Sequence, residues 1–256
     1  MIPSSGSSAL LLSLDLPVSS RVDQRVPKKL LIENGAPTAG DKHLINDGID
    51  ELLWLAALKP TTIGVPEYRD GVREYLEVPV LRLTLRAGAK ATRLVELVHR
   101  AVPYPLLLLT ELNERTGLSA AHKRLSQGEA GRTVLEGDVI AAEWDAVHDG
   151  ERWPAFRAAL ALAKQPQTTL YSLYQGWIDT LLALHAARVT GTFAVTANAE
   201  AAAVRRDALQ ECARLDKEIA RLRATAAKEK QMARRVELNL ELKRLEAAQA
   251  AARTNL

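Results

Sequence analysis

The chain has 256 residues, of which 47% are hydrophobic and 25% charged, and its formal net charge is +3. A chain of this length can bury a core of roughly 100 to 200 residues and still carry an extension, so we expect one compact domain with a helical tail. No apolar run is long enough to cross a bilayer, and the short run at residues 9–14 lacks the preceding Lys or Arg of a signal peptide. The one cysteine, Cys212, excludes a disulfide framework and favours a cytoplasmic setting.

The first elements expected are a strand at residues 9–14 and a short extended element at 25–32. From Asp41, a plausible N-cap, apolar residues recur at helical spacing and predict one helix that Pro60 ends. These apolar residues are Leu44, Ile45, Ile49, Leu52, Leu53 and Ala56.

The next segments predict an α+β domain at residues 1–150. Residues 75–86 alternate as a strand with one covered face, and a short helix with Leu94, Leu97, Val98 and Ala101 follows. The apolar run at 104–110 is typical of a strand buried on both faces. Two more strands are predicted at 118–125 and 133–144, around a turn at 126–131. This order favours a mostly antiparallel sheet with helices on one side.

Residues 151–198 are expected to form a helical segment and hinge. A linker at 148–154 leads into helical patterns at 153–163 and 168–188. A stretch of small residues at 190–199 then forms the hinge.

The tail, residues 199–256, contains no Gly or Pro, so it predicts one long, coiled-coil-like helix. A straight helix from residue 201 to 250 would be roughly 75 Å long. Its apolar residues form two stripes, which cover too much of the circumference for one neighbour. We therefore expect residues 231–246 to be buried against a partner protein or a second copy. The predicted partner-binding residues are Leu215, Ile219, Leu222, Val236, Leu238, Leu240, Leu242 and Leu245.

The basic excess of the chain also lies in the tail, where 13 Lys or Arg face 9 Asp or Glu from Glu200 onward. A solvated helix face is the plainer interpretation of this excess. Direct DNA binding is the alternative, with phosphate contacts from Arg221, Arg223, Lys228, Lys230, Arg234 and Arg235.

No catalytic or metal site is assigned from the sequence, and no cofactor is expected. The five histidines are scattered and have no ligand spacing. A nuclease of the PD-(D/E)xK type would need two acidic residues and a Lys on adjacent strands to hold a divalent ion. The nearest candidates are Asp70, Glu77, Glu111 and Lys123, but Leu112 and Asn113 break the acid-x-Lys step after Glu111.

Several segments along the chain form a recognisable set. They are Val26 to Lys29, Trp54 with Leu58, Pro60 and Thr62, the strand at 76–86, Ala101 to Pro105, and Lys228, Glu229, Gln231 and Asn239 in the tail. Together they resemble a bacterial family, the domain of unknown function 4391 family, over about 230 residues. The similarity departs at residues 126–133, where this chain has a longer and more polar hairpin.

The resemblance implies a setting and no catalytic residues. Members of this family are commonly encoded beside DNA methyltransferases and helicases of restriction-like antiviral loci. We therefore expect a non-catalytic accessory subunit of a bacterial DNA-targeting complex, which docks through its C-terminal helix on a helicase or methyltransferase, or on itself. The metal-dependent nuclease and the DNA-binding subunit stay open as alternatives.

Overall fold

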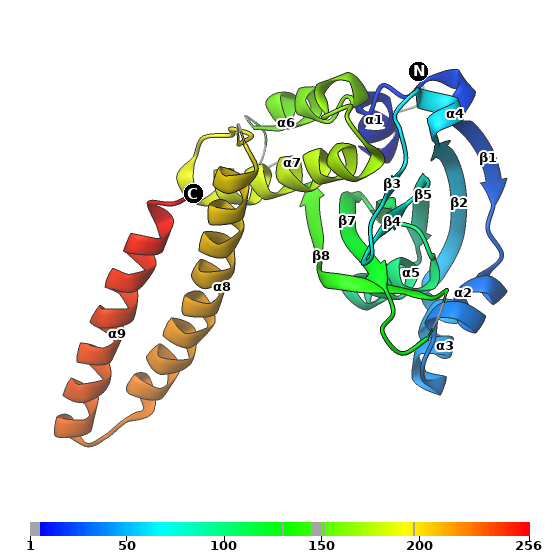
Figure 1. Cartoon of the computed structure of the whole chain (residues 1–256). Helices are drawn as coiled ribbons and strands as arrows, with labels where there is room; N and C mark the ends of the chain where they lie inside the picture. The colour runs from blue at the N-terminus through cyan, green and yellow to red at the C-terminus, as the bar shows by residue number, and fades with distance from the viewer. Residues whose placement is uncertain (1–5, 130, 145–149, 151, 197) are drawn as a thin grey trace. The chain divides into compact units, whose positions relative to one another are not determined.

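The computed structural model describes residues 6–129, 131–144, 150, 152–196 and 198–256 (Figure 1). The predicted linker at 148–154 lies partly outside these residues. The chain divides into two compact units, Met1–Leu181 and Leu182–Leu256. We call them the sheet unit and the tail unit.

The sheet unit is built on six strands in the order β1-β2-β5-β6-β7-β8. Only β5 and β6 are parallel, and helix α5 (Ala91–Ala101) makes the crossover that a parallel pair requires. The α+β class and the mostly antiparallel sheet are confirmed. The strands are β1 (Arg21–Arg25), β2 (Ile49–Leu58), β5 (Val78–Leu85), β6 (Leu107–Leu112), β7 (Arg115–Leu125) and β8 (Thr133–Trp144), beside a small sheet of β3 (Tyr68–Arg69) and β4 (Glu74–Tyr75).

One face of the large sheet packs against α2 (Lys28–Gly35), α3 (Ala39–Gly48) and α5 (Figure 1). Alternate residues of β5 and β6 enter this core, as the period of a strand requires. The core includes Leu81, Leu83, Leu85 and Leu108 from the strands, Leu106 just before β6, and Leu94, Leu97 and Val98 from α5.

The opposite face is covered by α1 (Gly6–Ser13) and by the part of α7 (Leu170–Thr190) that belongs to the sheet unit. The Tyr174 hydroxyl donates to the carbonyl of Leu106 at 2.8 Å and accepts the N–H of Ala121 at 2.8 Å. Helix α6 (Trp153–Ala159) is tied to α1 by Arg157, whose Nε donates to Ser13 Oγ at 2.7 Å. Helices therefore cover both faces, and the prediction of helices on one side is wrong.

Three local predictions near the N-terminus are also wrong. Residues 9–13 belong to α1, and Leu10 and Leu14, four residues apart, are both buried. Most of 25–32 is helix α2. The helix expected from Asp41 to Pro60 ends at Gly48, and the rest is strand β2, because its backbone pairs with β1 and β5. Thr38, not Asp41, caps α3 by accepting the N–H of Asp41.

The tail unit contains α8 (Ala199–Lys228) and α9 (Met232–Arg253), joined by residues 229–231. The helical tail is confirmed, but it is not one straight rod. Gln249 Nε2 donates to Asp216, and the Arg223 guanidinium bonds Glu246 at 2.6 Å, so α9 runs back along α8. We call this pair the C-terminal hairpin. A helix in water is marginal unless an apolar face is buried, and the fold-back buries one face of each helix.

Candidate interaction surface on the C-terminal hairpin

The hairpin covers much of the apolar surface that the sequence assigns to a partner. Five of the eight predicted partner-binding residues are buried; four of them pack in one cluster with Ala226, and Leu245 lies at its edge. Each helix of the hairpin therefore covers one apolar stripe of the other, without a partner protein. The buried five are Leu215, Ile219, Leu222, Leu238 and Leu242.

The other two, Val236 and Leu240, remain on the outside of α9. Their exposed fractions are 50% and 54%, and that of Met232, one turn before Val236, is 65%. Leu238 lies two residues from both Val236 and Leu240, and two residues rotate about 200° around a helix. The exposed pair thus faces away from the buried seam. We call Met232, Val236, Leu240 and Ala247 the outer stripe.

The fold-back also gathers the six predicted phosphate contacts around the hairpin turn at 229–231. Between positions 221 and 235 there are six basic residues and one acidic residue, Glu229. All six basic side chains are exposed. We call them the basic turn cluster, which consists of Arg221, Arg223, Lys228, Lys230, Arg234 and Arg235.

Ion pairs neutralise only a minority of this cluster. Arg223 pairs with Glu246 and Arg234 with Glu237, each at 2.6 Å, and the Glu237 hydrogen bond raises the pKa of Arg234. Over the residues that the structure describes, Arg221, Lys228, Lys230 and Arg235 form no ion pair. Four cations at one end of the hairpin are therefore available to an anionic partner.

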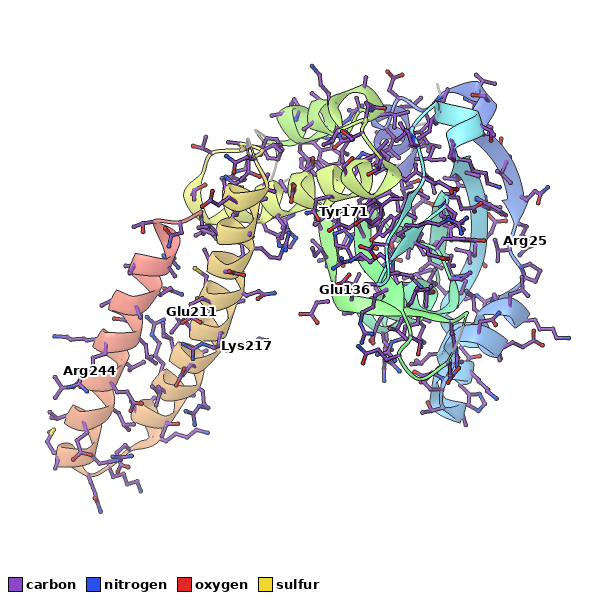
Figure 2. All side chains as sticks on the ribbon, in the orientation of Figure 1. Arg25, Glu136, Tyr171, Glu211, Lys217 and Arg244 are labelled. Atoms are coloured by element: carbon purple, nitrogen blue, oxygen red, sulfur yellow. The ribbon has the colours of Figure 1, made fainter. Side chains whose placement is uncertain are left out.

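The side chains of the tail extend into solvent along both helices (Figure 2). Figure 2 labels Glu211 and Lys217 on α8 and Arg244 on α9. Away from the turn the charges alternate in sign, as in the Arg214 pairs with Glu211 and Glu218 at 2.7 and 2.8 Å. The excess of positive charge in the tail is therefore concentrated at the hairpin turn.

In the sheet unit, the nuclease candidates do not meet. Glu111 is paired across the sheet with Thr116, whereas Lys123 lies seven residues further along β7, about 24 Å away. Glu111 accepts hydrogen bonds from Ser7 and Thr84, and Glu77 pairs with Lys59 at 2.9 Å. The described ranges contain no group of three His, Cys, Asp or Glu able to hold a metal ion.

Asp70 and Lys123 have structural roles. Asp70 accepts the N–H groups of Val72 and Arg73 in the turn between β3 and β4. The side chain of Lys123 is on the α5 face, 2% exposed, and donates to the carbonyl of Val102. Burial lowers the pKa of Lys123 to about 8. A buried, hydrogen-bonded ammonium cannot serve a metal site on the surface.

Beside Lys123, His99 Nε2 lies 2.9 Å from Ser119 Oγ, which is the spacing of a nucleophile and its base. Burial, with a smaller effect from Lys123, lowers the pKa of His99 to about 3. So low a pKa makes the imidazole a poor proton acceptor. No described residue bonds His99 Nδ1, so the third member of a triad is also missing.

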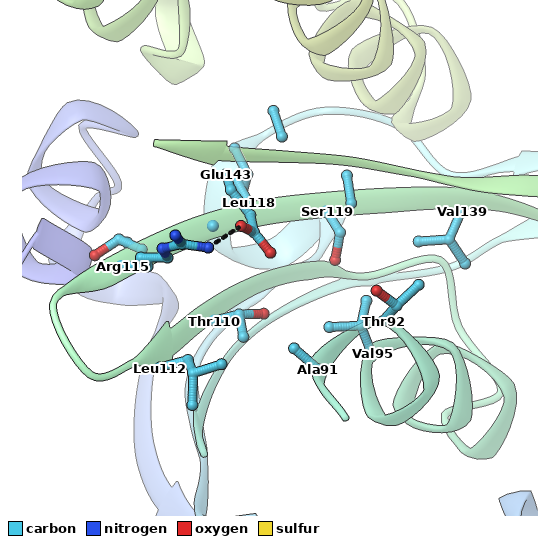
Figure 3. Close-up of a pocket in the computed structure, with 14 residues that line it drawn as sticks. Ala91, Thr92, Val95, Thr110, Leu112, Arg115, Leu118, Ser119, Val139 and Glu143 are labelled. Atoms are coloured by element: carbon cyan, nitrogen blue, oxygen red, sulfur yellow. Dashed lines mark ion pairs between the residues drawn. The ribbon is translucent and has the colours of Figure 1, made fainter. Parts of the chain in front are cut away.

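Ser119 lines a cavity of about 130 Å³ between α5 and the ends of β6, β7 and β8 (Figure 3). The hydroxyls of Thr92 and Thr110 lie in the same wall, and Arg115 and Glu143 form a 4.0 Å ion pair at its edge. The remaining wall is mainly aliphatic. The cavity therefore combines a few hydroxyls and one ion pair with an apolar lining.

A polar cluster that the sequence does not reveal surrounds His122 on the opposite face of the sheet. The Tyr75 hydroxyl lies 2.5 Å from His122 Nδ1, and Gln175 Oε1 lies 2.8 Å from Nε2. Arg73 binds Glu136 through two hydrogen bonds and sits 5.6 Å from the centre of the Tyr171 ring. These contacts fasten β4 to β7, β8 and α7. Spacing gave no signal for the cluster, although four of the five tyrosines lie in it: Tyr68, Tyr75, Tyr171 and Tyr174.

Both units are covered by one family model. A model described as a domain of unknown function (DUF4391) matches residues 14–248. The chain belongs to the DUF4391 family. Comparison with curated proteins and with solved structures finds no match. Because the DUF4391 match includes all of α8 and most of α9, the hairpin is part of the family's domain.

The residues that carry the DUF4391 resemblance support local structure. Lys28 donates to the carbonyls of Asn46 and Ile49, and Thr62 Oγ1 accepts the N–H of Lys59 at the start of α4 (Pro60–Ile63). In the tail, Glu229 accepts the N–H of Gln231 at 2.8 Å, so this motif forms the hairpin turn. Within the described ranges, every helix is too short or too polar to span a membrane.

Proposed function

We propose that this DUF4391 chain is a non-catalytic accessory subunit of a bacterial DNA-targeting complex, and that the basic turn cluster contacts the nucleic-acid backbone. One observation carries the proposal: six exposed basic residues converge on the hairpin turn, four of them without an ion pair. The genomic neighbourhood that the family resemblance implies also supports the proposal, because it places the gene beside genes for helicases and methyltransferases.

The physics of the contact favours phosphate over bases. Lys and Arg side chains that neutralise phosphates release counterions, which gives affinity without sequence preference. The turn presents its cations from two helix ends, and it offers no row of Asn, Gln or Arg on one helix face that would enter a groove. We therefore expect sequence-independent binding that weakens steeply as salt is raised.

The test is binding of the full chain to a fluorescent DNA duplex, measured by anisotropy at 0.1 M salt. Changing the four unpaired cations to Gln should weaken binding about a hundredfold or more. A control with the same charge change elsewhere should keep most of the affinity. The test changes are Arg221→Gln, Lys228→Gln, Lys230→Gln and Arg235→Gln, and the control changes are Lys42→Gln, Lys90→Gln, Lys164→Gln and Lys217→Gln. Equal losses in both variants would overturn the assignment to the turn.

Docking on a helicase or methyltransferase subunit is the second part of the proposal. Charged substitutions at Leu238 and Leu242 cannot test it, because both side chains belong to the core of the hairpin and their change would unfold it. Deleting residues 199–256 and co-purifying the subunits of the same locus is the better test. A truncated chain that retains the whole complex would contradict docking through the hairpin.

A further inference from the structure

Helix α9 has two apolar sides, and α8 covers only one of them. Leu238 and Leu242 face α8, whereas Val236 and Leu240 stand on the opposite side at 50% and 54% exposure. Met232 and Ala247 continue this outer stripe at spacings of four and seven residues, which keep them in line on a helix. Among the side chains of α8 only Val204 is a large exposed hydrophobic residue, so the outer apolar surface belongs to α9.

An isolated two-helix hairpin has half of a bundle core. Four-helix bundles close such a core by packing two hairpins through coiled-coil-like stripes. Positions 236, 240, 243 and 247 have the alternating four- and three-residue spacing of such a stripe, with Lys243 as its polar member. The outer stripe thus has the pattern of a helix–helix interface.

We infer that the outer stripe binds the outer stripe of a second copy of this chain, with the two α9 helices antiparallel and crossing near Leu240. The charges beside the outer stripe favour a second copy of this chain as the binding partner. Glu237 and Arg244 flank the same edge and are seven residues, or about 10.5 Å, apart, with their midpoint next to Leu240. A two-fold axis at that midpoint sets Glu237 of each copy against Lys243 and Arg244 of the other.

A parallel arrangement of the two α9 helices is unfavourable. Parallel helices in register would place Lys243 beside its own copy in the seam, where like charges repel. Among the described residues, Glu237 forms an ion pair with the exposed Arg234 alone, and Lys243 and Arg244 form none. Their charges are therefore available to the second copy. A pattern that is complementary to itself under a two-fold rotation indicates an isologous dimer rather than an unrelated partner.

This inference goes beyond the proposed function and does not depend on it, since no residue of the outer stripe belongs to the basic turn cluster. A wild-type chain that dimerises but does not bind DNA would count against the proposed function alone. A wild-type chain that binds DNA but stays monomeric would count against this inference alone.

The experiment is sedimentation velocity of the full chain over a range of concentrations. The wild type should show a monomer–dimer equilibrium, and Val236→Ser with Leu240→Ser should leave only monomer while circular dichroism shows unchanged helix content. Glu237→Arg or Arg244→Glu alone should weaken the dimer about tenfold, because each places two like-charge pairs across the axis. The double variant E237R/R244E should restore it.

The rescue makes the test specific. A partner other than a second copy, or a parallel pair, gives no recovery in the double variant. A wild type that stays monomeric at 100 µM (about a hundredfold above a micromolar Kd) would overturn the inference, as would a dimer that survives loss of the outer stripe. Single variants that weaken the dimer without rescue by the double variant would overturn the antiparallel arrangement.

Discussion

Replacing Lys123 by Met should stabilise the sheet unit at neutral pH and should do so less at high pH. Burial lowers the pKa of Lys123 from 10.5 to about 8. One pKa unit corresponds to about 1.4 kcal/mol, so holding this ammonium inside costs about 3 kcal/mol near pH 7. Methionine keeps the stem but loses the hydrogen bond to Val102, which offsets about 1 kcal/mol. We expect a net gain of about 2 kcal/mol.

The sign of the pH dependence follows from proton binding. Between about pH 8 and 10.5 the unfolded chain keeps a proton on Lys123 that the folded chain has lost. The stability of the wild type therefore rises with pH through this window, whereas the Met variant lacks this contribution. The difference in free energy of unfolding should shrink by about 2 kcal/mol between pH 7 and pH 9.5.

The assay is urea unfolding of both proteins at the two pH values, with Lys90→Met as the matched control. Lys90 is an exposed lysine before α5, so its replacement should change stability little at either pH. Other titrating groups cancel in the difference between variant and wild type. If the free energy of unfolding of Lys123→Met differed from that of the wild type by the same amount at pH 7 and pH 9.5, the claim that burying the Lys123 ammonium costs stability would be refuted.

Three further predictions concern other parts of the chain. Leu242→Ala removes a buried contact of the hairpin and should cost about 2 to 4 kcal/mol, seen as faster hydrogen exchange in α8 and α9, whereas Leu240→Ala in dilute, monomeric protein should change exchange little. Hydrogen bonds from Arg93 and Thr38 lower the pKa of Asp41, so this carboxylate contributes stability above its ordinary pKa of 3.8 and loses it as pH falls through the lowered value. Asp41→Asn should therefore destabilise the protein at pH 7 and flatten its acid unfolding curve; a curve as steep as that of the wild type would contradict this. Finally, the full chain should leave DNA uncut with Mg²⁺ or Mn²⁺, and cleavage that disappears in Glu111→Gln would revive the nuclease alternative.

Elements with one clear period could be predicted from the sequence. The alternation at 75–86, the helical spacing at 91–101 and the strands of β6, β7 and β8 all agree with the structure to within a few residues. Residues 49–58 are apolar at nearly every position, so they fit a helix and a strand equally well. Pairing with β1 and β5 decides between the two, and that pairing is a property of the whole sheet.

The tail shows why the site could be predicted only in part. The two apolar stripes and the six basic residues are visible in the sequence, but no Gly or Pro marks the turn at 229–231. The helix breaks there because packing α9 on α8 buries both seams, which local propensity does not express. Without the turn the cations are spread along a rod, and with it they form one cluster.

The salt dependence of DNA binding tests the central claim most directly. Each phosphate contact contributes about −0.9 to the slope of log K against log salt. Four to six contacts at the hairpin turn predict a slope of about −3.6 to −5.4 for the wild type. For the variant that keeps only Arg223 and Arg234 in the basic turn cluster, at most two contacts remain, which predicts a slope between about zero and about −1.8. The lysine control should keep the wild-type slope. A wild-type slope near zero, or the same slope in all three proteins, would contradict the account.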